Sequence, residues 1–190
     1  DTGAMYRAVA LAGLRGGVDW TRPDALADLA EGLSIELIGD RVWLDGEDVS
    51  REIRTPAVTE VTRHSADNPR IRALLVAQQR QLAGSRDVVT EGRDQGTVVF
   101  PDAPCKIFLS AGPEERARRR LADLLAQGEA VTLDEVLEAQ RRRDHRDRSR
   151  DVGPLLKAPD AIDVPTDGLS IAQVVDRLVE LVRARQAGGE

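Results

Sequence analysis

The spacing of apolar positions predicts three helices in the first part of the chain. Residues 4–15 are densely apolar, and Thr21 ahead of Pro23 begins a second helix that ends near Gly32. A third helix spans 69–84, because a proline opens it, a glycine closes it and its apolar face is continuous. That face comprises Ile71, Leu74, Leu75, Gln78 and Leu82.

Between these helices the apolar period changes from helical spacing to alternation. Residues 33–37 alternate apolar with polar, and residues 42–44 do so again. Gly39-Asp40 and Asp45-Gly46 are turn dipeptides at the two ends of the second alternating run. The pattern predicts a small antiparallel hairpin within an inserted lobe over about 33–65.

The second half of the chain alternates strand and helix patterns. Thr132 and Glu135 form the capping-box pattern at the start of a helix, and Ser170 with Gln173 does the same for the last helix. Strands separated by helices of this length are typical of a parallel sheet covered on both faces, so an α/β fold in one domain, 1–190, is expected. The expected strands are 87–90, 105–109 and 161–164, and the expected helices are 114–126, 133–149 and 170–182, the last with Ile171, Val174, Val175, Leu178 and Val182 on one face.

Composition narrows the classes of protein. The chain is 41% hydrophobic, and its longest apolar stretch near the start, 8–14, is too short to span a membrane. A single cysteine, Cys105, forms no internal disulfide, and its apolar neighbours favour a buried thiol in a reducing compartment. We therefore expect a cytoplasmic protein without a membrane partner. Two histidines and one cysteine give little support to a zinc site, and no metal ligands are predicted.

Positive charge is confined to one region of an acidic protein. Residues 114–150 hold ten arginines against nine acidic side chains, whereas the whole chain has a formal net charge of −6. Binding to a nucleic acid usually requires a basic face across the domain. A small anionic ligand is therefore expected instead of a polymer.

The first candidate site follows the apolar run 87–90. There Glu91-Gly92-Arg93-Asp94 comes at the carboxyl end of an expected strand, which is where wound parallel sheets bind ligands. Arg93 has the fork to hold a phosphate, and Asp94 can accept a hydrogen bond from an amino group. A surface turn with a salt bridge explains these residues equally well.

The second candidate site is the arginine-dense segment 141–150, with the sequence RRRDHRDRSR. On a continuous helix, Arg143, Asp147 and Arg150 share one face. Phosphoryl transfer needs such preorganised cations, because negative charge spreads over the oxygens of the transferring group. A solvated helix face or a surface for nucleic acid remains the alternative for this segment alone.

Seven longer segments, in their order along the chain, are DTGAMYR, GEDVSREIRT, NPRIRALLVAQQR, EGRDQGTVVFPDAPCKIFL, EERARRR, RRRDHRDRSR and PLLKAPDAIDVPT. Together they resemble bacterial cytidylate kinases, which belong to the P-loop nucleoside monophosphate kinases. The resemblance implies a three-layer α/β/α fold with the lobe at about 33–65 binding the acceptor nucleotide and a lid at about 141–153. It also implies that the protein transfers a phosphoryl group from ATP to CMP or dCMP. Mg²⁺ would bind through the phosphates of ATP, and the protein is expected to be a monomer.

The same resemblance implies a role for each matching residue. Residues that would bind the acceptor nucleotide are Tyr6, Arg7, Arg72, Arg93, Asp94, Arg143, Asp147 and Arg150. Among these, Arg72 and Asp94 would contact the cytosine. Residues that would offset charge during transfer are Arg93, Arg143 and Arg146, and those near ATP are Arg119, Arg120 and Arg148.

The chain departs from the family pattern in two places. The family has a serine before its NPRIR-like segment, and Arg63 stands at the aligned position. The family also begins with a strand and a G-x-x-x-x-G-K-[ST] loop, for which this sequence has no match. We therefore expect an N-terminal segment upstream of Asp1 in the natural protein.

Two other functions stay open from the sequence. One is a kinase for UMP or AMP, against which the pair Arg72 and Asp94 argues. The other is a non-catalytic module that binds a nucleotide or RNA through residues 141–150 and lacks an ATP site.

Overall fold

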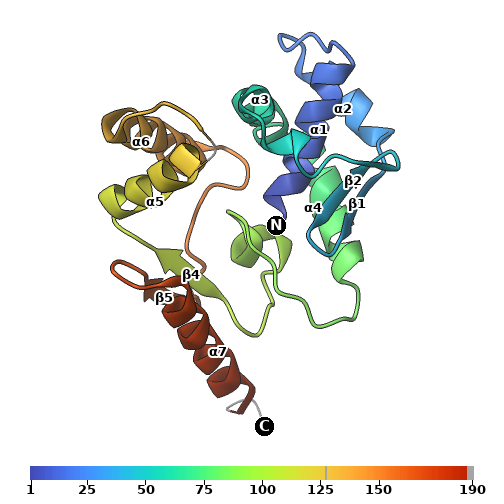
Figure 1. The fold of residues 1–190 in the computed structure, drawn as a ribbon. Helices are drawn as coiled ribbons and strands as arrows, with labels where there is room; N and C mark the ends of the chain where they lie inside the picture. Colours follow the sequence, from blue (N-terminus) through green and yellow to red (C-terminus); the bar gives the residue numbers. More distant parts are fainter. Residues whose placement is uncertain (127, 188–190) are drawn as a thin grey trace. The chain divides into compact units, whose positions relative to one another are not determined.

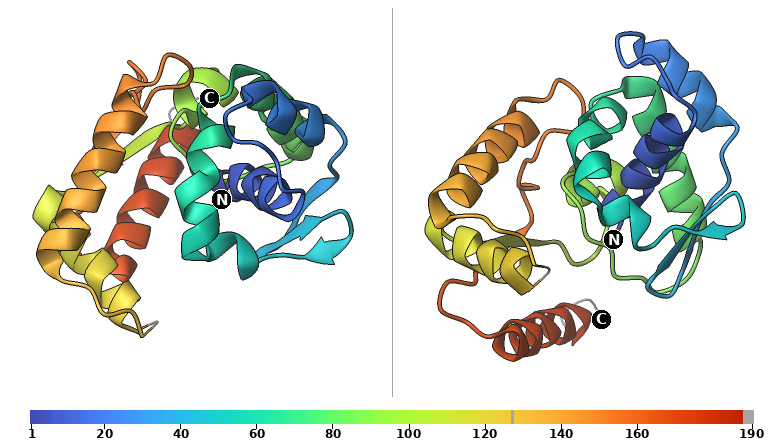
Figure 2. Two further views of the ribbon diagram at one scale, coloured as in Figure 1. Left: turned by 90° about the horizontal axis from the view of Figure 1, so that it is seen from above. Right: turned by 45° about the horizontal axis from the view of Figure 1, so that its top comes forward.

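The computed structural model describes residues 1–126 and 128–187, and Figures 1 and 2 show its ribbon. The chain divides into two compact units. The first comprises Asp1–Val99 with Asp151–Gly153, and the second comprises Phe100–Arg150 with the residues from Pro154 onward. Helices and strands occur in both units, which confirms the α/β expectation.

Helices form the core of the first unit. Met5 and Val9 of the first helix are fully buried, and this helix packs against α3. Asn68 caps α4 by accepting hydrogen bonds from the backbone N–H groups of Arg70 and Ile71. The helices are α1 (Gly3–Arg15), α2 (Pro23–Glu31), α3 (Pro56–Ala66) and α4 (Pro69–Ala83). The apolar pattern predicted α1, α2 and α4 but not α3. Thr21 does not cap α2, because its hydroxyl donates to Asp19 and Arg22 occupies the N-cap position.

A three-stranded antiparallel sheet lies beside these helices (Figure 1). It consists of β1 (Ile35–Ile38), β2 (Arg41–Leu44) and β3 (Glu47–Asp48), and Ile35 pairs with Leu44. Asp45 and Gly46 both have positive φ, at 50° and 82°, which matches a tight hairpin turn. The predicted hairpin is confirmed, and β3 extends it by one short strand.

The second unit is built on a parallel pair of strands. Strand β4 (Ile107–Ser110) pairs with β5 (Ile162–Pro165), and the connection contains α5 (Pro113–Ala126) and α6 (Leu133–Ser149). Thr132 and Glu135 make both hydrogen bonds of the capping box that opens α6. The final helix, α7 (Ile171–Ala187), begins with the reciprocal bonds of Ser170 and Gln173. The predicted parallel pairing and these helices are therefore confirmed.

One predicted strand is absent, because a strand requires a pairing partner that the local pattern does not specify. Residues 87–90 are not a strand, since no other segment among the described residues pairs with them, and Val89 is 100% exposed. The apolar face of α7 is not buried either, with Ile171 at 86% and Val175 at 50% exposure. Unpredicted short elements are the 3₁₀ turn Glu52–Arg54 and the π-helical turn Gln95–Val99. In the described part of the chain, every helix is too short or too polar to cross a membrane.

The contact between α1 and α2 leads to a prediction about Gly13. A Cβ atom there would lie 2.7 Å from Leu26 Cδ1 and 2.7 Å from the ring of Trp20. Gly13→Ala should therefore lower the free energy of unfolding by about 1–2 kcal/mol through overpacking, despite the better helix propensity of alanine. Urea unfolding followed by fluorescence measures this change. Gly32→Ala is the control, because its nearest neighbouring atom is 3.7 Å away, and an equally stable Gly13→Ala protein would contradict the packing argument.

Candidate functional site

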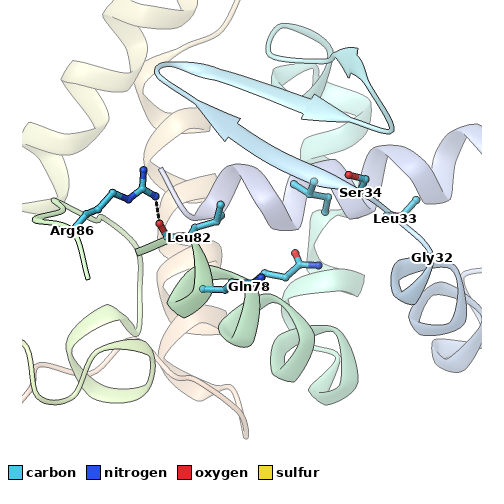
Figure 3. Close-up of a pocket in the computed structure, with 8 residues that line it drawn as sticks. Gly32, Leu33, Ser34, Gln78, Leu82 and Arg86 are labelled. Carbon is cyan, nitrogen blue, oxygen red and sulfur yellow. Dashed lines mark hydrogen bonds between the residues drawn. The ribbon is translucent and has the colours of Figure 1, made fainter. Parts of the chain in front are cut away.

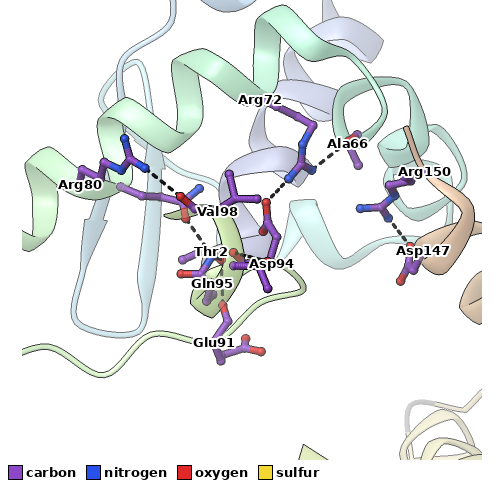
Figure 4. A network of polar contacts seen from close by, with 12 residues as sticks. Thr2, Ala66, Arg72, Arg80, Glu91, Asp94, Gln95, Val98, Asp147 and Arg150 are labelled. Carbon is purple, nitrogen blue, oxygen red and sulfur yellow. Dashed lines mark hydrogen bonds and ion pairs between the residues drawn. The ribbon is translucent and has the colours of Figure 1, made fainter. Parts of the chain in front are cut away.

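A buried ion pair joins helix α4 to the segment that follows residues 87–90. Arg72 Nη2 pairs with Asp94 Oδ2, and each residue is only 4% exposed (Figure 4). Arg72 Nη1 also donates to the carbonyl of Ala66, with a distance of 3.1 Å. Removing one partner of such a pair leaves a buried charge and typically costs about 3–5 kcal/mol. The pair therefore fixes the side chain of Asp94 relative to α4.

The backbone of Asp94 is also fixed by hydrogen bonds. Its carbonyl oxygen accepts from the backbone N–H groups of Thr97, Val98 and Val99 at 2.9–3.3 Å. This single acceptor begins the π-helical turn Gln95–Val99. Arg93, half-buried, lies directly before this turn.

Helix α1 places Tyr6 and Arg7 next to this ion pair and its neighbours. The Arg72 guanidinium carbon lies 5.5 Å from the centroid of the Tyr6 ring, within cation–π distance. Arg7 Nη1 donates to the carbonyl of Ile53 at 3.1 Å and to Thr59 Oγ1 at 2.8 Å. Tyr6, Arg72 and Asp94 thus form one cluster, and Arg7 extends from α1 toward α3.

The position aligned with the family serine is occupied by an exposed arginine. Arg63 Nε donates to His64 Nε2 at 3.3 Å, so this ring nitrogen acts as an acceptor. Burial, with the charge of Arg63 as the second cause, lowers the pKa of His64 below its ordinary value. Ser65 is fully buried, and its hydroxyl donates to the carbonyls of Tyr6 and Thr62 at 2.8 Å. Ser65 thus ties α3 to α1.

In the second unit, Asp147 organises the arginine-dense end of α6. Asp147 is 3% exposed and forms an ion pair with Arg150, whose side chain is 12% exposed (Figure 4). Arg143 Nε lies 3.8 Å from the other carboxylate oxygen, and its side chain is 55% exposed. Arg146 and Arg148 are exposed. The predicted helical face of Arg143, Asp147 and Arg150 is therefore present, with Arg150 as the residue that caps the helix.

The predicted ATP residues differ in how they are held. Arg119 donates to Thr166 Oγ1 at 3.1 Å and to Glu115 Oε1 at 3.0 Å, so it joins α5 to the end of β5. Arg120 is exposed on the same helix. Arg148, in contrast, lines a cavity of about 230 Å³ between α5 and α6. The cavity is lined by Pro113, Arg116, Gln140, Arg141, Asp144, His145 and Arg148.

A larger cavity of about 590 Å³ lies elsewhere in the first unit. Figure 3 shows it between the residues that lead into β1 and the C-terminal half of α4. No residue that we predicted to bind substrate or ATP lines it. Its lining comprises Gly32, Leu33, Ser34, Ile35, Gln78, Gln81, Leu82 and Arg86.

Sequence reasoning missed three polar residues that hold the segment Glu91–Asp94. They are Thr2, Gln79 and Gln95, which are linked by hydrogen bonds between side chains. The buried face of α4 includes Arg72 and Gln79, whereas Leu74 and Gln78, which the pattern placed on that face, are only half-buried. The sequence feature that could have indicated this contact is Gln79, a polar residue next to the apolar face of α4.

Comparison with known proteins decides the family. The family model described as cytidylate kinase matches residues 1–184. The chain belongs to the cytidylate kinase family. A cytidylate kinase from Rhodopirellula baltica is 52% identical over 183 residues, which cover 96% of this chain and 80% of that protein. A cytidylate kinase from Geobacter sulfurreducens is 46% identical over 98% of this chain and 82% of that protein. A cytidylate kinase from Rhodococcus jostii is 48% identical over 100% of this chain and 85% of that protein.

Proposed function

We propose that this protein is a cytidylate kinase that transfers the γ-phosphoryl group of ATP to CMP or dCMP. The observation that supports this most is the buried pair of Arg72 and Asp94, which lies against Tyr6. Cytosine presents an amino donor where uracil presents a carbonyl acceptor. A carboxylate held in the interior therefore favours cytosine over uracil.

Arginines at the acceptor end would bind the phosphate and ribose of CMP. In this proposal Arg93 and Arg7 hold the phosphate, and Tyr6 contacts the ribose. Arginine suits this role because its planar fork matches the oxygens of a phosphate. Arg7 is prepared for it by its bonds to Ile53 and Thr59, which restrict the side chain before a ligand binds.

The arginines of α6 would act in the transfer step. We propose that Arg143 and Arg146 offset the charge of the transferring group, while Asp147 and Arg150 contact the acceptor sugar and phosphate. The acceptor oxygen is already anionic near neutral pH, so the reaction requires positioning and charge neutralisation instead of a strong base. Mg²⁺ carried on the β- and γ-phosphates of ATP supplies further neutralisation. Arg119, Arg120 and Arg148 are proposed to contact ATP.

The cellular setting follows from the same features. We propose a cytoplasmic monomer whose ligands are nucleotides and not nucleic acid, in line with its net charge of −6. The lobe over 33–65 would bind the acceptor nucleotide, and 141–153 would act as a lid that excludes water.

We further propose that a strand and a phosphate-binding loop precede Asp1 in the natural protein. Each unit has exposed apolar residues where such a segment could pack: Val88 and Val89 in the first unit, and Leu109 and Ile171 in the second. The relatives also extend beyond the matched region, which is 80–85% of the length of those named above.

The upstream reading frame tests this part of the proposal. We expect roughly 30 codons before Asp1 that encode an apolar strand and then a G-x-x-x-x-G-K-[ST] loop, because its backbone N–H groups and lysine bind the ATP phosphates. Sequencing the gene checks this. A stop codon immediately upstream, with a start at or near Asp1, would contradict the kinase proposal and favour a module that binds nucleotide or RNA.

Base selection depends on Asp94 in this proposal. In the full-length protein, Asp94→Ala should lower kcat/KM for CMP by about 10²- to 10⁴-fold, since the amino group of cytosine loses its acceptor. Discrimination between CMP and UMP should shrink as well. Steady-state assays with CMP, UMP and AMP measure both changes.

Two further variants separate base reading from folding. Asp94→Asn keeps the size of the side chain, and the ratio of kcat/KM for CMP and UMP does not depend on the folded fraction. Asp87→Asn is the control, because Asp87 is exposed in the preceding segment. Unchanged selectivity in both Asp94 variants would show that another residue reads the base.

The lid arginine Arg143 gives an independent test. Arg143→Ala should lower kcat by about 10²-fold, equivalent to roughly 3 kcal/mol, if this arginine stabilises charge that develops during transfer. Stability should change by less than about 0.5 kcal/mol, since the side chain is largely exposed. Arg142→Ala is the matched control, because Arg142 pairs with Glu138 on the same helix. Normal turnover in Arg143→Ala would exclude the catalytic role, and normal turnover in Arg143→Lys alone would show that charge suffices.

A further inference from the structure

A second polar residue of α4 holds the segment that carries Arg93 and Asp94. Gln79 lies two helical turns after Arg72 on the buried face of α4 and is 4% exposed. Its side-chain oxygen Oε1 accepts a hydrogen bond from Gln95 Nε2 at 3.1 Å. Helix α4 therefore contacts the segment through the side chains on both sides of one peptide bond, Asp94 and Gln95.

Gln95 extends this contact to the start of α1 (Figure 4). Its Nε2 also donates to Thr2 Oγ1 at 3.0 Å. The Thr2 hydroxyl in turn donates to the carbonyl of Glu91 at 2.8 Å, and the Thr2 backbone N–H donates to the same oxygen at 3.2 Å. The chain of bonds from Gln79 thus ends on the first residue of the Glu91–Asp94 segment.

Close packing makes this arrangement sensitive to small shifts. A Cβ atom on Gly92 would lie 2.6 Å from Thr2 Oγ1 and 2.9 Å from Gln95 Cγ, so the backbone at Gly92 lies directly against both side chains. A movement of Gln95 would therefore displace the backbone before Arg93. Misplacement of a binding group by about 1 Å is enough to cost up to 10²-fold in rate.

Burying a glutamine at position 79 lowers the stability of the fold relative to an apolar side chain. Among the residues that the structure describes, Gln79 Nε2 has no hydrogen-bond partner, and an unpaired buried donor destabilises a fold. An apolar side chain of the same length would pack there at lower cost. The contribution of Gln79 is its side-chain oxygen, which accepts the hydrogen bond from Gln95.

We propose that Gln79, acting through Gln95 and Thr2, is a positioning residue that sets the placement of Arg93 and Asp94 for the acceptor nucleotide. The inference rests on the proposed function, because it assigns these two residues to CMP. Gln79 itself does not touch the nucleotide in this account. Its loss should weaken CMP binding and leave ATP binding unchanged.

Gln79→Met in the full-length protein tests the inference. Methionine keeps the length of the side chain and removes the acceptor, so the dissociation constant and KM for CMP should rise about five- to tenfold, as for one lost hydrogen bond. KM for ATP should stay the same. The thermal unfolding midpoint should change little, since loss of the unpaired donor on Gln79 offsets the N–H that is left unpaired on Gln95. Gln81→Met, an exposed position on the same helix, should match the wild type in all four quantities.

A purely structural role predicts a different pattern. Loss of folded protein would lower kcat and the unfolding midpoint while leaving the KM for CMP unchanged. Gln95→Met removes the other partner of the same hydrogen bond, and it replaces Gln79→Met as the test if that variant does not fold. The double variant should be no worse than Gln95→Met alone, because Gln95→Met already removes the only hydrogen bond that Gln79→Met removes.

The outcomes separate this inference from the proposed function. Unchanged CMP affinity in Gln79→Met and Gln95→Met, with a wild-type protein that binds and phosphorylates CMP, would overturn the inference alone. A wild-type protein that neither binds nor phosphorylates CMP would overturn the proposed function and this inference with it. Weakened CMP binding with normal ATP dependence supports both.

Discussion

Arg72 and Asp94 must neutralise each other because both lie in the interior of the first unit. This requirement fixes where α4, the end of α3 and the segment after residue 90 can lie, since the pair also involves the carbonyl of Ala66. The ring of Tyr6 covers the guanidinium from α1. A nucleotide base that reaches this cluster meets groups already in place, so little reorganisation is needed on binding.

A buried carboxylate that orders an arginine occurs in each unit. Asp94 holds Arg72 in the first unit, and Asp147 holds Arg150 in the second. In both cases the carboxylate is nearly inaccessible. The cation beside it offsets the cost of burying it, and the pairing restricts the side chain of that arginine. A rigid fork at Arg150 would suit a phosphate, because its donors are oriented before the anion arrives.

Parts of the candidate site could be predicted from the sequence, and parts could not. Arg93 and Asp94 were predicted because they follow an apolar run, and the charged residues at the end of α6 because helical spacing places them on one face. The link from Gln79 through Gln95 to Thr2 was missed, since it joins residues 16 and 93 positions apart. The hydroxyl of Ser65 likewise bonds to the backbone of Tyr6, 59 positions away. Local patterns contain no information about such partners.

The sequence by itself determined the elements whose stabilising contacts are local. The helix caps at Thr132 and Ser170 and the turn at Asp45-Gly46 each depend on residues a few positions apart, and all three form as predicted. The tertiary structure decided which faces of those elements are buried and which segments pair. Residues 87–90 form no strand and α7 keeps its apolar face exposed, because pairing and burial require a neighbour that the pattern does not specify. The buried face of α4 includes Arg72 and Gln79 for a related reason: their partners on the 91–99 segment, and not hydrophobicity, make burial possible.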